Sequence, residues 1–379
     1  MYKKILITGG SGFIGSNICL KLLDKGYEVV VLDSLLPQIH GENPFSSPLY
    51  LSIKDKVTFF HGSITDKEIL QSAIQNVDAI IHFAADTGTG QSMYEIHRYV
   101  DVNVGGTALL LDLLVNTKHQ VKKLIVASSR SIYGEGKYFS EIYGEVYPSH
   151  RKDEDMQKGD FGVHYKDDKS LKLLPTSEDS KIHPSSVYGI TKQNQEQMVM
   201  TVCPTIGIVP VAFRYQNVYG PGQSLSNPYT GILSIFSTQI RNLKPINIFE
   251  DGLESRDFVY IDDVVNATIL GLEKEEANNR IFNVGSGVAT TVNEVVDALI
   301  KAYNPKKEIE VTITGNYRLG DIRHNFADLT KIKTLLGFTP TVDFNEGINR
   351  FTKWVSGQEI KESKYQESLQ EMKAKGLYK

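Results

Sequence analysis

Residues 4–15 read KILITGGSGFIG, and this segment sets the architecture expected for the rest of the chain. A short apolar run leads into a glycine-rich turn, after which apolar residues recur at helical spacing. A strand, a turn and a helix are therefore predicted in that order. Glycines let the backbone turn tightly and approach a pyrophosphate, which would lie on the amides and positive dipole end of the helix. We therefore expect a dinucleotide to contact Gly9, Gly12, Phe13, Ile14 and Gly15.

A second apolar run, Glu28 to Asp33, places an acid at the end of a strand. It lies about 20 residues beyond the glycines, where a carboxylate can accept hydrogen bonds from a ribose diol and repel a 2'-phosphate. The residues that follow, Ser34 to Leu36, supply no arginine to bind such a phosphate. NAD is therefore the expected cofactor, in preference to NADP.

Three further apolar runs continue this alternation through the first half of the chain. Strands are predicted at Val57–Phe60, Ala79–Phe83 and Lys123–Ala127, and helical patterning follows them. Alternating strands and helices indicate a parallel sheet covered by helices on both faces. The predicted fold class is therefore α/β, a doubly wound parallel sheet of the Rossmann type with a smaller C-terminal α/β substrate domain.

Composition excludes several classes of partner. The 379 residues carry a formal net charge of -4, with 41% hydrophobic and 23% charged residues, so neither nucleic acid nor an anionic membrane surface is an expected partner. No apolar run approaches the roughly 20 residues needed to span a bilayer, and the first strand begins too early to leave room for a secretory signal. Cys19, Cys203 and the histidines lack metal-ligand spacing. A cytoplasmic protein without a metal site is expected.

Polar and small residues follow the predicted strands at the edge where ligands bind in such sheets. Ser63 and Ile64 follow the third strand and could line an adenine pocket, while Asp66 is as well explained as a helix N-cap. Ala84 and Ala85 follow the fourth strand and are small, as a backbone beside a cofactor should be. The next loop offers Thr87, Gly88, Thr89 and Gln91 to the reacting end of a substrate.

Tyr188 and Lys192 are separated by four positions in a helix predicted from Ser185 to Thr201, so they share one helix face. A nearby cation lowers the pKa of a phenol, which makes Tyr188 a candidate general base with Lys192 as the cation. Ser129 ends the fifth strand and could share the substrate oxygen with Tyr188, with Ser128 beside the cofactor. Asn103 lies in a helix and either bridges two elements or contacts the cofactor.

Several motifs together resemble the extended short-chain dehydrogenases that act on nucleotide sugars. They are TGGSGFIG at 8–15, SS at 128–129 with YG at 133–134, YGITK at 188–192, FRYQNVYGP at 213–221, RDFV at 256–259 and RLGD at 318–321. The resemblance implies that Ser129 and Tyr188 contact the sugar oxygen that is oxidised and that Lys192 holds the nicotinamide ribose. It also implies that the nucleotide diphosphate is bound by Asn217, Arg256 and Arg318, a task that suits guanidinium groups.

The resemblance also implies a domain division and an assembly. Residues 1–216 would form the NAD-binding domain, with a long insertion at about 135–184 and a return of the chain near 258–264. Residues 217–379 would bind the nucleotide sugar. A homodimer is implied, in which the helices around Asn103 and Tyr188 pair as a four-helix bundle. The insertion could cover the sugar or make a subunit contact, and the tail from Lys361 to Lys379 is expected to be peripheral.

Two loops, residues 85–96 and 129–136, are similar to those of bacterial dTDP-L-rhamnose 4-epimerases. This narrower likeness implies that dTDP-L-rhamnose is epimerised at C4 to dTDP-6-deoxy-L-talose. A 4,6-dehydratase would need an acid–base carboxylate pair after Ser129, where Arg130 and Ser131 stand instead. Arg130 thus joins the candidate substrate residues. A UDP-hexose or UDP-N-acetylhexosamine 4-epimerase, a keto-sugar reductase and a cofactor-sensing regulator are the alternatives.

Overall fold

The computed structural model describes residues 2–229, 231–359 and 365–379. At its centre is a seven-stranded sheet in the order β14-β9-β5-β4-β1-β2-β3, and every neighbouring pair of strands is parallel. The doubly wound α/β prediction is confirmed. The strands are β1 (Lys4–Thr8), β2 (Glu28–Asp33), β3 (Thr58–His61), β4 (Ala79–His82), β5 (Lys123–Ser129), β9 (Val209–Tyr215) and β14 (Arg280–Val284).

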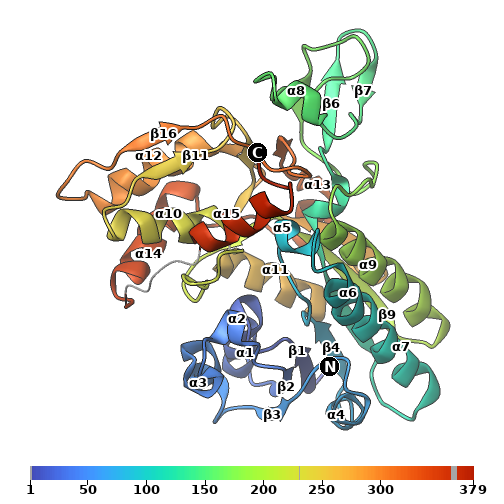
Figure 1. Cartoon of the computed structure of the whole chain (residues 1–379). Coiled ribbons are helices and arrows are strands. Elements are labelled where there is room, and N and C mark those ends of the chain that lie inside the picture. The colour runs from blue at the N-terminus through green and yellow to red at the C-terminus, as the bar shows by residue number, and fades with distance from the viewer. Residues whose placement is uncertain (1, 230, 360–364) are drawn as a thin grey trace.

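The sheet is buried on both faces because its strands are almost continuously apolar. In β1, Ile5 and Ile7 join the core on one face and Leu6 joins the core on the other, as expected for a strand whose successive side chains point in opposite directions. Helices α1 (Phe13–Asp24) and α11 (Ile261–Glu273) pack on the first face. The second is covered by α4 (Lys67–Ala73), α7 (Gly106–Asn116) and α9 (Val187–Thr205) (Figure 1).

The C-terminal half forms a smaller α/β unit beyond the carboxyl ends of the sheet strands (Figure 1). Its helices are α10 (Ile232–Arg241), α12 (Val292–Tyr303) and α14 (Phe344–Ser356), whereas α13 (Thr330–Leu336) packs against β14 of the large sheet. Its parallel strand pairs are β10 (Asn217–Tyr219) with β13 (Phe258–Tyr260) and β11 (Ile246–Ile248) with β16 (Val311–Ile313). A third small sheet contains β15 (Thr290–Thr291), β12 (Ser255–Arg256) and β17 (His324–Asn325).

Short helical turns connect these elements at the edge of the sheet. They are α2 (Pro37–His40), η1 (Pro44–Ser46), α3 (Pro48–Ile53), α5 (Thr89–Ser92), α6 (Ile96–Tyr99), η2 (Val100–Gly105), η3 (Arg130–Tyr133) and η4 (Glu275–Ala277). The strand predicted at 57–60 lies one residue later, because pairing with β2 sets its ends. Within the described residues, none of the helices combines the length and apolar character needed to cross a bilayer.

The insertion forms a three-stranded antiparallel sheet that stands away from the body of the molecule (Figure 1). It contains β6 (Lys137–Ser140), β7 (Gly144–Val146), α8 (Asp153–Met156) and β8 (Lys172–Leu174), and Tyr138, Val146 and Val163 make its small core. Arg151 anchors it to the C-terminal half through two hydrogen bonds to the carboxylate of Glu250, at 2.7 and 2.9 Å.

The C-terminal tail is not peripheral, so that prediction was wrong. In α15 (Tyr365–Ala374), Tyr365, Leu369 and Met372 are buried and belong to the main core. The prediction was based on the lysines and glutamates of this segment. It overlooked that these three apolar residues recur at helical spacing and therefore share one face of the helix. The part of that prediction covering residues 361–364 lies outside the described residues.

Candidate active site

Two cavities lie at the carboxyl ends of the sheet strands and meet beside the N-terminus of α9. The glycine-turn cavity, named for the turn after β1, has a volume of about 580 Å³. The arginine cavity, of about 330 Å³, is lined by Arg130, Arg256 and Arg318. Ser129 and Tyr188 line both cavities. Molecules bound in the two cavities would therefore meet at these two side chains.

The turn after β1 leaves no room for side chains. A Cβ on Gly15 would lie 2.3 Å from the carbonyl oxygen of Gly9, and a Cβ on Gly9 would lie 2.8 Å from the backbone nitrogen of Ala84. Gly9 also has a φ of 71°, in the left-handed region. Glycine is thus required for the close backbone approach that a bound pyrophosphate needs.

Asp33 lies at the end of β2, on the wall of the same cavity. Its two carboxylate oxygens accept hydrogen bonds from the backbone N–H groups of Ser11 and Leu35, each at 2.8 Å. These bonds fix the carboxylate, and each oxygen keeps a lone pair for a further donor. The residues present therefore fit a dinucleotide with a free ribose diol.

The structure brings nearly all the predicted cofactor residues to this cavity. Those that line it are Gly9, Gly12, Phe13, Ile14, Gly15, Asp33, Ser63, Ile64, Ala84, Ala85, Ser128, Tyr188 and Lys192. Asp66 instead caps α4 by accepting from the backbone N–H groups of Glu68 and Ile69, which is the second of its two predicted roles.

Asn103 is the predicted cofactor residue that does not line the cavity. It is fully buried, and its amide bonds to both backbone groups of Asp86, at 2.7 and 3.0 Å, and donates to the Thr191 hydroxyl at 3.0 Å. Thr191 in turn donates to the carbonyl of Tyr188 at 2.9 Å. Of its two predicted roles, the structure supports the bridge, which joins the loop after β4 to the first turn of α9.

Tyr188 is held in the first turn of α9 by its backbone. Ser186 caps the helix by accepting from the N–H of Gly189 at 3.1 Å, and the N–H of Tyr188 donates to the Ser92 hydroxyl at 3.0 Å. Burial raises the pKa of the Tyr188 phenol, while the Ser129 hydroxyl and the Arg130 guanidinium lower it. These two neighbours favour the phenolate form.

Lys192, the cation predicted beside Tyr188, is held by the backbone of β5. Its ammonium donates to the carbonyl of Ala127 at 3.0 Å, and burial lowers its pKa to about 7. The shared helix face places the two side chains on the same side of α9, but the Ala127 carbonyl holds the ammonium at the wall of the glycine-turn cavity. The cation that lowers the pKa of Tyr188 is Arg130.

Ser129 and Arg130 stand where β5 turns into η3. The Ser129 oxygen accepts from the Ser131 hydroxyl at 2.8 Å, so its own hydrogen stays available to another acceptor. Arg130 donates from Nε to the Asn217 side-chain oxygen at 2.7 Å. Burial, and then the neighbouring Arg256, lowers the pKa of Arg130 to about 9.

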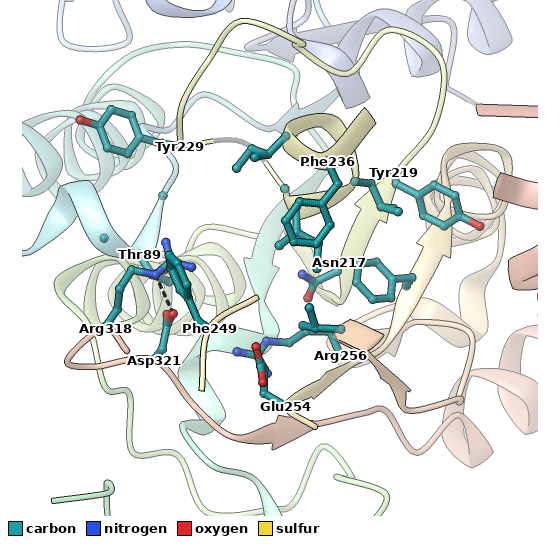
Figure 2. A pocket seen from close by; sticks show the side chains of 18 of the residues that line it. Thr89, Asn217, Tyr219, Tyr229, Phe236, Phe249, Glu254, Arg256, Arg318 and Asp321 are labelled. Carbon is teal, nitrogen blue, oxygen red and sulfur yellow. Dashed lines mark ion pairs between the residues drawn. The ribbon is translucent and has the colours of Figure 1, made fainter. Parts of the chain in front are cut away.

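The arginine cavity combines cationic groups with aromatic walls, as Figure 2 shows. Arg318 pairs with Asp321 at 3.1 Å, whereas Arg256 donates to the backbone carbonyls of Ser255, Ile322 and Arg323. The positive charge of Arg256 also acts on the nearby carboxylates of Glu254 and Asp321, so the wall carries both signs of charge, and its three arginines suit an anion such as a diphosphate. Besides Tyr188, the aromatic side chains on the wall are Tyr219, Tyr229, Phe236, Phe249, Phe258 and Tyr365.

The predicted substrate residues are divided between the cavities. Thr87 lines the glycine-turn cavity, Gly88 lines both, and the arginine cavity is lined by Thr89, Ser129, Arg130, Asn217, Arg256 and Arg318. Gln91 lines neither, because its side chain is buried and hydrogen-bonded to Gln38 and Tyr99. Its position in a polar loop did not indicate which way its side chain points.

Several lining residues were missed by the sequence reading. They include Gln216, Tyr229, Phe249, Glu254, Asp321, Tyr365 and Met372. Gln216 and Asp321 lie inside motifs that were recognised, so their neighbours could have indicated them. Tyr229, Tyr365 and Met372 come from segments without a motif, and only the folding of distant parts of the chain brings them to the cavity.

A dinucleotide-sized cavity and an anion-attracting cavity that share a serine and a tyrosine define a dehydrogenase-like enzyme, in which a bound cofactor exchanges hydride with a second molecule. The family model described as the NAD dependent epimerase/dehydratase family matches residues 5–155 and 164–285, and the chain belongs to this family. The protein is therefore an NAD-dependent enzyme, and Asp33 stands where an NAD-binding acid is expected.

Individual relatives extend over nearly the whole chain. A dTDP-L-rhamnose 4-epimerase from Burkholderia thailandensis is 36% identical over 357 residues, which cover 93% of this chain and 95% of that protein. The UDP-glucose 4-epimerase of Thermotoga maritima with UDP-glucose has a TM-score of 0.74 at 31% identity, covering 93% and 98% of the two chains. The UDP-glucuronic acid 4-epimerase of Bacillus cereus with UDP-glucuronic acid and NAD has a TM-score of 0.76 at 27% identity, covering 93% and 99%.

Proposed function

We propose that this enzyme epimerises a nucleotide sugar at C4 through a transient 4-keto sugar, and that its substrate is dTDP-L-rhamnose, which becomes dTDP-6-deoxy-L-talose. The observation that carries the proposal is that Ser129 and Tyr188 line both cavities. A sugar carbon held there lies between a proton acceptor and a redox cofactor. The Burkholderia thailandensis relative, a dTDP-L-rhamnose 4-epimerase, supports the choice of substrate.

Each catalytic residue has a defined task in this scheme. The residues of the glycine-turn cavity would hold NAD, which would supply a reversible hydride acceptor for the carbinol carbon. Tyr188 as phenolate takes the hydroxyl proton, and Ser129 donates a hydrogen bond to the same oxygen. Lys192 lines the glycine-turn cavity and holds the nicotinamide ribose. Asn217, Arg256 and Arg318 bind the diphosphate.

Epimerisation follows when the keto sugar presents its other face before the hydride returns. Tyr188 then gives its proton back to the new alkoxide, so the cycle is redox-neutral and no acid or base is consumed. The diphosphate must remain anchored while the sugar turns, which is the task proposed for Arg256 and Arg318. Water must be excluded for as long as the ketone exists.

Two other reactions of such enzymes fit the residues less well. Elimination of water needs an acid–base carboxylate pair directly after the serine, where this chain has Arg130 and Ser131. A reductase that consumes NADPH would have to bind a 2'-phosphate, which Asp33 repels. A UDP-sugar 4-epimerase is the second candidate, because UDP-sugar 4-epimerases are similar over almost the full chain.

The domain division is proposed with the function. Residues 1–216 bind NAD and residues 217–379 bind the nucleotide sugar, with 135–184 inserted into the first domain. The chain returns to the first domain at 258–264. Strand β14 also returns to it, since it pairs with β9 in the large sheet. We further propose a homodimer located in the cytoplasm.

A panel of dTDP-, UDP-, GDP- and CDP-sugars tests the proposal, with product stereochemistry read by NMR. Conversion of dTDP-L-rhamnose to its C4 epimer is the expected result, and activity restricted to UDP-sugars would select the second candidate. Tyr188→Phe should lower turnover by roughly 10²–10⁴-fold while dTDP affinity, measured by calorimetry, stays within about twofold. Turnover retained by Tyr188→Phe would show that another group is the base.

A further inference from the structure

The C-terminal segment, residues 365–379, contributes to the lining of the arginine cavity although it comes from the far end of the chain. Figure 1 shows its helix α15 beside α5. Tyr365 and Met372 of α15 line the cavity beside Arg318. The sulfur of Met372 also lies close to Gly90 of α5, where an added Cβ would be 3.2 Å from it. This segment therefore forms part of the cavity wall.

A first attachment joins α15 to two loops that line the cavities. The carboxylate of Glu371 accepts hydrogen bonds from the hydroxyls of Tyr94 and Tyr229, at 3.1 and 3.0 Å, and these hydroxyls lie 2.6 Å apart. Tyr229 lines both cavities. Glu371 itself is exposed, so water can replace these bonds and the attachment can open at small cost.

A second attachment holds the chain on either side of Arg318. Tyr317 exchanges two backbone hydrogen bonds with Lys379, at 2.9 and 3.0 Å, and the N–H of Leu319 donates to the carbonyl of Leu377 at 3.0 Å. The ring of Tyr378 packs at 5.2 Å from that of Phe249. The last residues of the chain therefore fix the strand-like segment from which the Arg318 guanidinium enters the cavity.

We propose that residues 365–379 are a closing segment of the nucleotide-sugar cavity, which opens to admit substrate and closes to keep the keto sugar inside. The proposal rests on the proposed function, because an epimerase loses its keto-sugar intermediate if the cavity opens between the two hydride transfers. The apolar face of α15 supplies the water-excluding wall. The bonds of Glu371 are exposed and open easily, so the movement has to break chiefly the apolar contacts of α15 and the backbone bonds of residues 377–379.

Hydrogen–deuterium exchange of the full-length enzyme tests the closing movement without requiring turnover. The enzyme is loaded with NAD, and exchange is measured alone, with dTDP or UDP, and with the corresponding sugar nucleotide. We expect the amides of 365–379 to be protected several-fold more by the sugar nucleotide than by the nucleoside diphosphate alone. Unchanged exchange in this segment, while binding is seen by calorimetry, would overturn the proposal.

A double variant, Glu371→Ala with Tyr378→Ala, tests the retention of the ketone, and Glu367→Ala on the exposed face of α15 is its matched control. We expect the double variant to raise KM for the sugar nucleotide about tenfold. It should also increase the fraction of enzyme left in the NADH form, with an equal amount of free keto sugar trapped by borohydride. Ketone release equal to that of the control would overturn the proposal.

If the wild-type enzyme epimerises none of the sugars, the proposed function fails instead. The exchange experiment still decides whether residues 365–379 make the closing movement.

Discussion

At the scale of single residues, the surroundings of Tyr188 decide how readily its phenol ionises. Burial raises the pKa of the phenol, while the Ser129 hydroxyl and the positive charge of Arg130 lower it. Arg130 is itself fixed by its hydrogen bond to Asn217, so its position relative to Tyr188 is set before substrate binds. This arrangement ties the general base directly to the wall of the arginine cavity.

Replacing Arg130 should therefore change the pH dependence of turnover. Arg130→Met removes the cation, so the pKa of Tyr188 rises further and the phenolate fraction at neutral pH falls. The ascending limb of the plot of kcat against pH should shift to higher pH by about one unit, so that activity near pH 7 is roughly tenfold lower. Arg130→Lys keeps the charge and serves as the control. An unmoved limb in the methionine variant would contradict this account of the base.

Glu254 gives a second prediction at this scale, for the ligand-free protein. Burial raises its pKa from 4.5 to about 7, so the folded state favours the protonated carboxyl and loses stability as pH rises from the unfolded value toward the folded one. Glu254→Gln should leave stability unchanged near pH 4 and increase it by about 3 kcal/mol near pH 8. Urea denaturation at the two pH values measures this. The exposed Glu276→Gln is the control, and an equal gain in both variants would refute the explanation.

The motifs single out candidate reacting residues, but they do not reveal which neighbours those residues contact. A spacing of four in a helix places Tyr188 and Lys192 on one face, but it does not reveal that the Ala127 carbonyl lies within reach of the ammonium. That contact depends on how β5 packs against α9. The prediction that Gln91 contacts the substrate was wrong for the same reason, because its hydrogen bonds to Gln38 and Tyr99 come from tertiary packing.

At the scale of elements, apolar runs predicted the strands because a parallel strand is buried on both faces and has little freedom in composition. Helix α12 begins at a capping box formed by Thr291 and Glu294, a pattern that marks a helix start. The positions of the insertion and of α15 in the molecule could not be predicted from the sequence. Their apolar residues are few, and the partners of those residues lie far away in the chain.

Arg151 allows a test of how the insertion is anchored to the body of the molecule. Its guanidinium donates to Glu250 and to the carbonyl of Asp321, and its side chain is only 3% exposed. Arg151→Met should destabilise the protein by about 3 kcal/mol, because it leaves buried acid without its partner. The remaining bond from Arg323 to Glu250 limits the loss. Chemical denaturation measures the effect.

The exposed neighbour Lys152→Met is the matched control for Arg151→Met. It should change stability by less than about 0.5 kcal/mol, as is usual for a surface substitution. Limited proteolysis should cut the insertion faster in the Arg151 variant than in the control. Equal stability and equal cleavage of the two variants would mean that the insertion is held to the body by other contacts.

At the scale of the whole molecule, exposed apolar side chains occur on α9 and on the helices that pack against it. Ile96, Val100, Val115 and Ile190 lie on α6, η2, α7 and α9 and are 51%, 43%, 50% and 46% exposed. Apolar residues on adjacent exposed helices are typical of a subunit interface. They support the proposed homodimer, in which these helices pair across a two-fold axis.

Light scattering tests the homodimer. The wild-type protein should have twice the mass of its 42.4 kDa chain, and Val100→Glu combined with Ile190→Glu should reduce the mass to that of one chain because buried charges repel across the interface. Leu243→Glu, an equally exposed position elsewhere, should remain dimeric. A wild-type monomer, or a double variant that stays dimeric, would exclude this interface.

The two halves of the molecule meet at Ser129 and Tyr188, and the function proposed for the whole chain depends on hydride leaving and returning to one sugar carbon at that point. The most direct measurement is NMR of dTDP-L-rhamnose labelled with deuterium at C4 and incubated with the enzyme and NAD. We predict a C4 epimer that still carries deuterium at C4. A C4 epimer that has exchanged its label with solvent would contradict hydride transfer and return.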